Sequence, residues 1–392
     1  MTYDFDCIID RRETECIKWQ VYGADVLPMW VADMDFAAPE PVIAALRTRV
    51  EHGVFGYEAH PLALVEAIIA RLQQLYGWTV APEAIVFLPG VVTAFNLAAQ
   101  AFLEPGDGLL IQTPVYPPFF GVTGAANAVM HGMELTRNAD GRYSVDYDLF
   151  ARTITDRTRL FLLCNPHNPV GRVFREDELL RMAELCLRHN MLICSDEIHG
   201  DLILNGYRHI PIAALAPEIA ARTITLMAPS KTFNIAGLHC SFAVIPDAEL
   251  RQRYLAARRG IVDSVNLLGF TAALAAYQEG QPWLEAVLHY LEANRDFVVA
   301  FVEQSMPGVS VAAPEGTYLA WLDCRAAGIP GNAHDFFLKE AQVAVNDGVT
   351  FGPGGEGFVR LNFGCPRALL EEGLGRMRSA LLRRRNSLRR RL

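Results

Sequence analysis

The chain has 392 residues, a formal net charge of −9, and 20% charged residues. A chain of this length is expected to form one large and one small domain rather than a single core. Its negative charge disfavours nucleic acid as the main partner. No apolar run approaches the length of about eighteen residues that a membrane span needs. The acidic start lacks the basic and apolar regions of a signal peptide, which predicts a cytoplasmic protein.

Eight cysteines are scattered along the chain without a Cys-x-x-Cys pair. Several lie inside apolar runs, as Cys164 and Cys194 do. We interpret them as small buried side chains in a reducing compartment, not as a disulfide framework or a zinc site. The basic end from Arg383 to Arg391 predicts the charged end of a last helix and a solvated tail, and contact with a polyanion is the alternative.

The first 50 or so residues contain a loop-rich, arm-like segment that includes Met29–Phe36. A helix is predicted over 39–53. Phe55-Gly-Tyr57 then predicts a tight turn that presents a tyrosine. From residue 62 onward helices and short apolar strands alternate. In chain order we expect a helix at 62–77, a strand at 84–89, a helix at 90–106, strands at 108–114 and 159–166, a helix at 175–190, and strands at 191–197, 223–230 and 240–246.

Nearly continuous apolar strands separated by helices predict an α/β fold whose largely parallel sheet is covered by helices on both faces. Residues 264–304 are predicted to be helical, with Pro282 near the start of a long helix that connects two domains. Later strands at 317–323 and 358–364 indicate a smaller α/β domain built from both chain ends. We expect the parts to be an arm and part of the small domain at 1–50, the large domain at 51–285, and the C-terminal small domain at 286–392.

Lys231 lies between two predicted strands, among small and hydroxyl neighbours. That position places it near the top of the sheet, where partial burial lowers the pKa of an amine and lets it attack an aldehyde to give a Schiff base. Other polar residues also follow strands directly, among them Asn168, Asp196 and Ser230. Ligands bind at the carboxyl ends of parallel strands. Taken alone, however, the lysine also fits a surface loop.

Each of the other signals has a plain structural alternative. Asp196 could bind a metal with His199, cap a helix, or hold a cationic ring nitrogen; no third metal ligand is evident, so we expect no metal. Asn168 lies in a rigid Asn-Pro turn that is equally well explained as structural. Val91 and Val92 begin a helix straight after a strand, so their N–H groups and the helix dipole favour a phosphate.

The order of these residues, with Tyr116 before Asn168 and Arg360 after Lys231, resembles the fold-type I pyridoxal 5′-phosphate enzymes, the aspartate aminotransferase superfamily. The resemblance covers nearly the whole chain. The segments at 30–36, 165–171, 195–199, 230–238 and 360–367 are similar in particular to the cystathionine β-lyase branch. These cysteine–sulfur lyases include a bacterial enzyme that also modulates a maltose regulator.

The resemblance implies a role in cofactor binding for several residues. Lys231 would hold pyridoxal 5′-phosphate as a Schiff base and later move the α-proton. Asp196 would keep the ring nitrogen protonated, while Asn168 binds the 3′-oxygen of the ring with His199 beside it. Tyr116 would stack on the ring face.

The same resemblance implies the phosphate and substrate contacts. Val91, Val92 and Ser230 would hold the phosphate. Tyr57 is expected to reach the phosphate of a neighbouring subunit, which implies an obligatory homodimer. Arg360 would bind the substrate α-carboxylate as a bidentate fork, helped by the backbone near Ala32. Trp30 and Tyr318 are candidates for the side-chain pocket, with core packing as the alternative for both.

Three residues depart from the pattern of the aminotransferases. His199 replaces their usual tyrosine, Ala228 a common serine, and His239 an arginine that many of them carry near the phosphate. The departures favour a lyase and leave open how the phosphate charge is balanced. We therefore expect β-elimination from cystathionine or a related cysteine S-conjugate to pyruvate, ammonia and a thiol. The alternatives are a class I/II aminotransferase, or a regulatory protein that keeps the cofactor site and acts through a protein partner.

Overall fold

The computed structural model describes residues 3–389, and its larger sheet has seven strands in the order β2-β10-β9-β8-β7-β3-β4. These strands are β2 (Ile85–Leu88), β3 (Gly108–Thr113), β4 (Val129–Glu134), β7 (Thr158–Cys164), β8 (Leu192–Asp196), β9 (Thr223–Met227) and β10 (Ser241–Val244). All neighbouring pairs are parallel except the two that β10 makes. The largely parallel sheet is therefore confirmed.

Helices cover both faces of this sheet because its strands are apolar on both sides. Leu160 and Leu162 of β7 pack into a core with α4 and α10, whereas Phe161 and Leu163 pack into a second core with α6 and α7. The helices around the sheet are α3 (Leu62–Tyr76), α4 (Val91–Phe102), α5 (Val122–Ala126), α6 (Tyr147–Thr153), α7 (Glu176–Arg188), α8 (Pro217–Ala220), α9 (Pro229–Thr232), α10 (Ala248–Arg258) and α11 (Leu267–Glu279).

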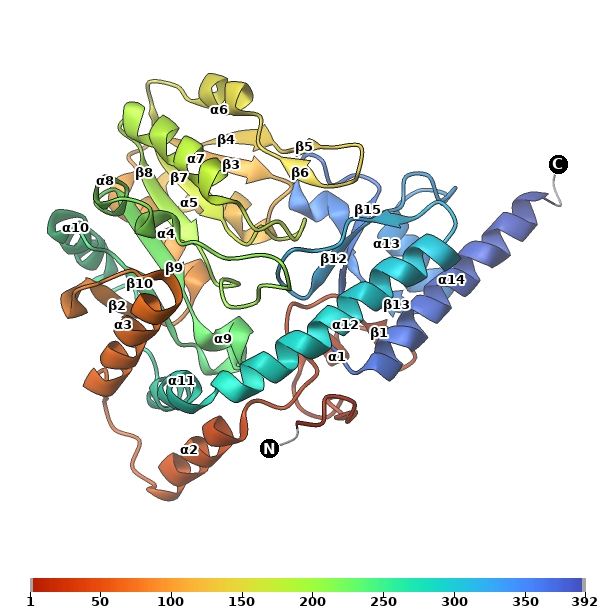
Figure 1. The fold of residues 1–392 in the computed structure, drawn as a ribbon, viewed down its shortest axis with the longest axis horizontal. Coiled ribbons are helices and arrows are strands. Elements are labelled where there is room, and N and C mark those ends of the chain that lie inside the picture. Colours follow the sequence, from red (N-terminus) through yellow and green to blue (C-terminus); the bar gives the residue numbers. More distant parts are fainter. Residues whose placement is uncertain (1–2, 390–392) are drawn as a thin grey trace.

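A second, antiparallel sheet has the order β11-β12-β15-β14 and lies to the right of the large sheet in Figure 1. Its strands are β11 (Ser310–Val311), β12 (Leu319–Asp323), β14 (Asn346–Asp347) and β15 (Phe358–Asn362). Its helices are α12 (Gln281–Ser305), α13 (Ala333–Phe336) and α14 (Arg367–Arg389). As expected, Pro282 is the second residue of the long helix, which runs from α11 towards the second sheet.

The amino-terminal segment joins the carboxyl-terminal part of the chain. It contains α1 (Ile17–Gln20), β1 (Leu27–Pro28) and α2 (Glu40–Glu51), and β1 pairs in parallel with β13 (Val343–Ala344). One hydrophobic core contains Met29 and Phe36 of this segment together with Leu291 of α12 and Leu370 of α14. Both chain ends therefore build the smaller unit.

A few features were not predicted. The edge strand β4, the helix α10 and a hairpin of β5 (Thr136–Arg137) and β6 (Tyr143–Ser144) are additional elements. The basic end continues α14 to residue 389, and residues 390–392 of the predicted tail lie outside the described residues. None of the described helices is long and apolar enough to cross a membrane.

Candidate active site

A cavity of about 480 Å³ lies where β2, β7, β8 and β9 end, and it is closed on one side by Arg360 from the second sheet. Most of the predicted site residues line this cavity: Trp30, Ala32, Val91, Val92, Tyr116, Asn168, Asp196, His199, Ser230, Lys231 and Arg360. Tyr57 and Tyr318 are not in the lining. The fold thus gathers residues from nearly the whole length of the chain.

Lys231 lies in the short helix α9, directly after β9. Its Nζ donates a hydrogen bond of 2.7 Å to the carbonyl oxygen of Ala32. Burial lowers the pKa of Lys231 to about 8, against the opposing charges of Asp33 and Asp196. A large share of this amine is neutral near pH 8, and a neutral amine can attack an aldehyde.

Asp196 ends β8 as a buried carboxylate. One oxygen accepts a 3.2 Å hydrogen bond from the Ile198 N–H, and no residue between 3 and 389 forms an ion pair with it. Burial therefore raises the pKa of Asp196 to about 7. A cationic ring nitrogen placed against this carboxylate would supply the missing partner.

His199 lies on the same wall, three residues after Asp196, and it is also buried. Burial lowers its pKa to about 3, so the imidazole stays neutral, and its Nδ1 has no hydrogen-bond partner in the described structure. Its ring packs edge-on against Tyr318 with 5.8 Å between the ring centroids. The described residues contain no cluster of three or more His, Cys, Asp or Glu side chains that could hold a metal ion.

Arg360 of β15 reaches the cavity as a buried guanidinium. It donates to Asn168 Oδ1 at 3.0 Å, to the Trp30 carbonyl at 2.8 Å and to Asn346 Oδ1 at 2.5 Å, while its Nε has no partner in the described structure. Burial lowers the pKa of Arg360 to about 10. Because no carboxylate of residues 3–389 contacts it, this guanidinium is suited to bind an anion from outside the chain.

Asn346 is a site residue that the sequence did not reveal. It belongs to the two-residue strand β14 and lies directly opposite Arg360 in the sheet register. So short a strand has no detectable periodicity, so only the pairing of β14 with β15 brings the amide to the guanidinium.

The first turn of α4 forms another part of the cavity lining. Gly90 precedes this helix in an extended conformation, and among residues 3–389 no side-chain cap hydrogen bond is formed at this helix start. Val91, Val92 and Thr93 line the cavity there, together with Ser230 and His239. Free N–H groups and the positive end of the helix dipole favour a phosphate at this position.

The remaining aromatic candidates have different surroundings. Burial raises the pKa of Tyr116, which lines the cavity after β3. Tyr318 is buried behind the wall and donates a 2.9 Å hydrogen bond to the Ala32 carbonyl. The indole of Trp30 donates to the Lys18 carbonyl at 3.1 Å. Tyr57 is fully exposed in the loop between α2 and α3, outside the cavity of its own chain.

Comparisons with known proteins show the family to which the chain is related. Residues 25–377 match the family model described as aminotransferase class I and II. The chain is 43% identical to the cystathionine beta-lyase PatB of Bacillus subtilis over 96% of its own length and 100% of that protein. It is 35% identical to the protein MalY of Escherichia coli over 97% of this chain and 99% of MalY.

A solved structure shows the same relationship in three dimensions. The PLP-bound C–S lyase from Staphylococcus hominis superimposes with a TM-score of 0.93 at 34% sequence identity, covering 97% of this chain and 99% of that one. The family match over residues 25–377 spans both sheets and every segment that lines the cavity.

Proposed function

Because the chain belongs to the class I and II aminotransferase family, we propose that it is a pyridoxal 5′-phosphate enzyme that breaks carbon–sulfur bonds. Its substrate is cystathionine or a related cysteine S-conjugate, and its products are pyruvate, ammonia and a thiol. The observation that carries the proposal is similarity over the full chain to cystathionine β-lyases, joined to the convergence of Lys231, Asp196 and Arg360 on one cavity.

The residues of the cavity fit the cofactor. The first turn of α4 suits its phosphate, and the lowered pKa of the Lys231 amine suits attack on its aldehyde. Asp196 forms no ion pair within the described part of the chain, and the ring nitrogen would provide a cationic partner. The Asn168 amide group, whose oxygen is already bound by Arg360, still has its nitrogen to donate to the ring oxygen, and Tyr116 can stack on the ring.

The chain's own residues divide the work of elimination. Arg360 binds the substrate α-carboxylate, which places the α-hydrogen near Lys231. The Lys231 amine takes this hydrogen as a proton, and a pKa of about 8 suits it for transfer in both directions near neutral pH. When bound, the cofactor supplies an electron sink for the charge left at the α-carbon.

The sulfur leaves as a thiolate. The electron pair of the broken Cα–H bond forms a Cα–Cβ double bond while the Cβ–S pair departs with sulfur, and the resulting enamine hydrolyses to pyruvate and ammonia. Thiols have pKa values of about 8.5, so their anions are good leaving groups. Neutral His199, in place of the tyrosine usual in aminotransferases, is consistent with elimination over transamination.

One assay tests the reaction type. Purified holoprotein is incubated with cystathionine and no keto acid, and pyruvate, ammonia and homocysteine should appear in equal amounts. Adding 2-oxoglutarate should not raise the rate, and Lys231→Ala should abolish it. Product that forms only with an added keto acid, with an amino acid accumulating in proportion, would show an aminotransferase.

The proposal includes a cytoplasmic homodimer. All eight cysteines are unpaired, which is usual in a reducing compartment, and Tyr57 is exposed where a second chain could receive it. A second role through a regulatory partner remains the alternative, and a pull-down against transcription regulators would test it.

A further inference from the structure

The first three residues of the segment 30–36 line the cavity, and this part of the segment contacts both Lys231 and Arg360. Its carbonyl oxygens do the contacting: Ala32 accepts from Lys231 Nζ at 2.7 Å, and Trp30 accepts from Arg360 Nη2 at 2.8 Å. The segment has no regular secondary structure and is held by few backbone hydrogen bonds, such as that from the Asp35 N–H to the Gly364 carbonyl at 2.9 Å, so side chains also contribute to the position of these carbonyls.

Two asparagines tie the segment to the elements that carry the site. Asn234, three residues after Lys231, bonds the N–H of Met34 and the carbonyls of Met34 and Phe36 at 2.7 to 3.0 Å. Asn362, two residues after Arg360, donates to the Val31 and Asp33 carbonyls, each at 2.6 Å.

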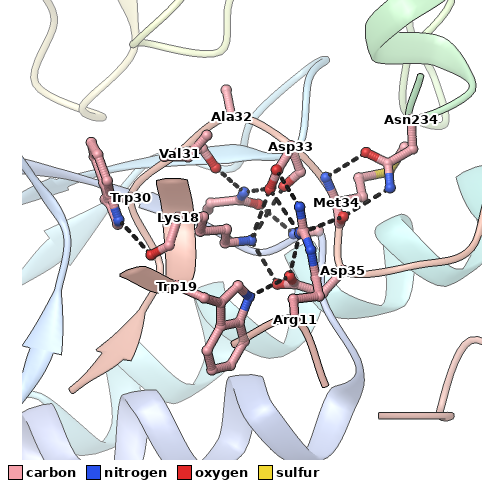
Figure 2. Close-up of polar contacts among 12 residues, drawn as sticks. Arg11, Lys18, Trp19, Trp30, Val31, Ala32, Asp33, Met34, Asp35 and Asn234 are labelled. Atoms are coloured by element: carbon pink, nitrogen blue, oxygen red, sulfur yellow. Dashed lines mark hydrogen bonds and ion pairs between the residues drawn. The ribbon is translucent and has the colours of Figure 1, made fainter. Parts of the chain in front are cut away.

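The third tether comes from the amino-terminal arm and is ionic (Figure 2). Arg11 pairs with Asp33 and Asp35, each at 2.7 Å, and Lys18 pairs with Asp35 at 2.6 Å and with Asp33 at 3.3 Å. The indole of Trp19 donates to Asp35 at 3.1 Å. Lys18 and Asp35 are both buried, and removal of the Lys18 cation would leave Arg11 as the one cation of this cluster for two carboxylates.

We propose that Arg11 and Lys18 of the amino-terminal arm are positioning residues for this site. Through Asp33 and Asp35 they hold the segment 30–36 so that the Ala32 carbonyl meets Lys231 and the Trp30 carbonyl meets Arg360, and they balance the Asp33 charge that acts on Lys231. The arrangement of the site therefore depends on the arm being fixed in place, although neither Arg11 nor Lys18 lines the cavity. The inference rests on the proposed role of Lys231 in cofactor binding.

The two cations and two carboxylates of the cluster also compensate each other's charge. The ionisable groups that act on Lys231 are Asp33, Asp196, Arg360 and His199. The same cavity is also lined by Tyr116, Cys164, His239 and Cys240, and Tyr318 donates to the Ala32 carbonyl that Lys231 contacts. Among the groups that act on this amine, Asp33 makes the strongest favourable contribution to the ammonium form of Lys231, and it is the one that the arm neutralises. Removal of a charge from the cluster should therefore shift the pKa of Lys231, upward when a cation is removed and downward when an anion is removed.

The test compares Arg11→Gln, Asp33→Asn and the charge-retaining Arg11→Lys. Arg11 is chosen over Lys18 because its side chain is 22% exposed, whereas that of Lys18 is 1% exposed and would leave a buried gap. Arg12→Gln is the matched control, since Arg12 belongs to the same arm but pairs with Asp10 and forms no ion pair with Asp33 or Asp35 in the described structure; it touches the cluster only by stacking on Trp19. The readout is the pH midpoint of the absorbance change of the bound cofactor.

Loss of the Arg11 cation should raise this midpoint, and loss of the Asp33 anion should lower it, each by about 0.5 to 1 pH unit. Arg11→Lys and Arg12→Gln should stay within about 0.2 units of the unaltered protein. A cluster that only stabilised the fold would lower the melting temperature and leave the midpoints equal, or move both the same way. Either result would overturn the inference.

A second measurement separates this inference from the proposed function. In protein stripped of cofactor, the pH at which a small acylating reagent labels Lys231 should shift in the same opposite directions in Arg11→Gln and Asp33→Asn. Unshifted labelling would contradict the positioning role whatever the protein binds. Absence of cofactor absorbance in the unaltered holoprotein would instead contradict the proposed function.

Discussion

The chain has three lysines, and their surroundings explain why only one suits a carbonyl cofactor. Lys18 is buried against Asp35 and Asp33, whose charges outweigh its desolvation and raise its pKa. Lys339 is exposed, with Asp335 at 3.6 Å. Lys231 alone is buried with only a carbonyl as its hydrogen-bond partner, so its pKa falls. A nucleophilic amine needs this combination of desolvation and no carboxylate contact.

The first prediction at this scale concerns Lys231. Borohydride reduction of the holoprotein should fix the chromophore to the peptide that contains Lys231, as peptide mass spectrometry can show. In cofactor-free protein the rate of cofactor attachment should rise as the pH increases through about 8, because the ammonium form present at lower pH cannot attack. A label on Lys18 or Lys339 would disprove the assignment.

The second concerns Arg360. Arg360→Lys keeps a positive charge but loses the fork that holds Asn168, Asn346 and a substrate carboxylate together. We expect kcat/KM to fall roughly 30- to 150-fold, which corresponds to a loss of about 2 to 3 kcal/mol in transition-state binding. Arg325→Lys is the control, since Arg325 pairs with Asp323 outside the cavity. If the two variants have equal kcat/KM, Arg360 does not bind the substrate.

At the residue scale, the sequence indicated the side chains with distinctive chemistry, but not the side chains whose hydrogen bonds hold the neighbouring backbone in place. Lys231, Asp196 and Arg360 follow or lie on apolar strands, and this is visible in the pattern. Asn234 and Asn362 were missed because their partners are backbone atoms of the segment 30–36, about 200 and 330 residues away in the chain. A hydrogen bond to a distant carbonyl has no pattern in the sequence.

At the element scale, hydrophobic runs located the buried strands but not their direction. β10 runs antiparallel to β2 and β9, yet its residues are as apolar as those of the parallel strands. The edge strand β4 was missed because only Met133 in it is buried and Val129 is exposed. An edge strand with one covered face lacks the continuous apolar run by which the central strands were found.

The α4 helix supports a prediction of its own. Val91→Pro removes one N–H from the first turn, and proline is tolerated there because Gly90 is extended and the position is the first of the helix. Loss of one hydrogen bond to a phosphate should weaken cofactor affinity about tenfold, for a cost of about 1.5 kcal/mol. Spectroscopic titration of cofactor-free protein measures this affinity.

The matched control is Ala248→Pro, at the first position of α10, where the preceding residue is likewise extended. It should leave cofactor affinity unchanged. Melting of the cofactor-free proteins checks that both variants are folded. Equal affinities for Val91→Pro and Ala248→Pro would mean that the Val91 N–H does not contact the phosphate.

At the scale of the whole molecule, the connection between the chain ends could be predicted only in outline. The smaller unit depends on the pairing of β1 with β13 and on a core shared by both ends, and such contacts over more than 300 residues are not encoded locally. The division at residues 50 and 285 remains a prediction. So does the homodimer, for which the exposed loop between α2 and α3 is the structural support, with Val54, Phe55 and Tyr57 all exposed.

The last prediction tests whether Tyr57 serves a second subunit. Tyr57 is too exposed to serve the cavity of its own chain, and a phosphate contact across a two-fold axis would explain its position. Tyr57→Phe should then lower activity at limiting cofactor by about tenfold, the loss of one charge-assisted hydrogen bond. After subunit exchange with inactive Lys231→Ala, half of the dimers are hybrids, and one of their two sites has both native residues.

An equal mixture of the two variants should therefore reach about a quarter of the activity of the unaltered enzyme. If Tyr57 instead acts within its own chain, every site with Lys231 also carries the phenylalanine, and the mixture should give only about a twentieth. Unaltered protein mixed equally with Lys231→Ala should keep about half of its activity in either case, which controls for the exchange itself. Activity of the variant mixture near a twentieth would show that Tyr57 is not donated across a subunit interface.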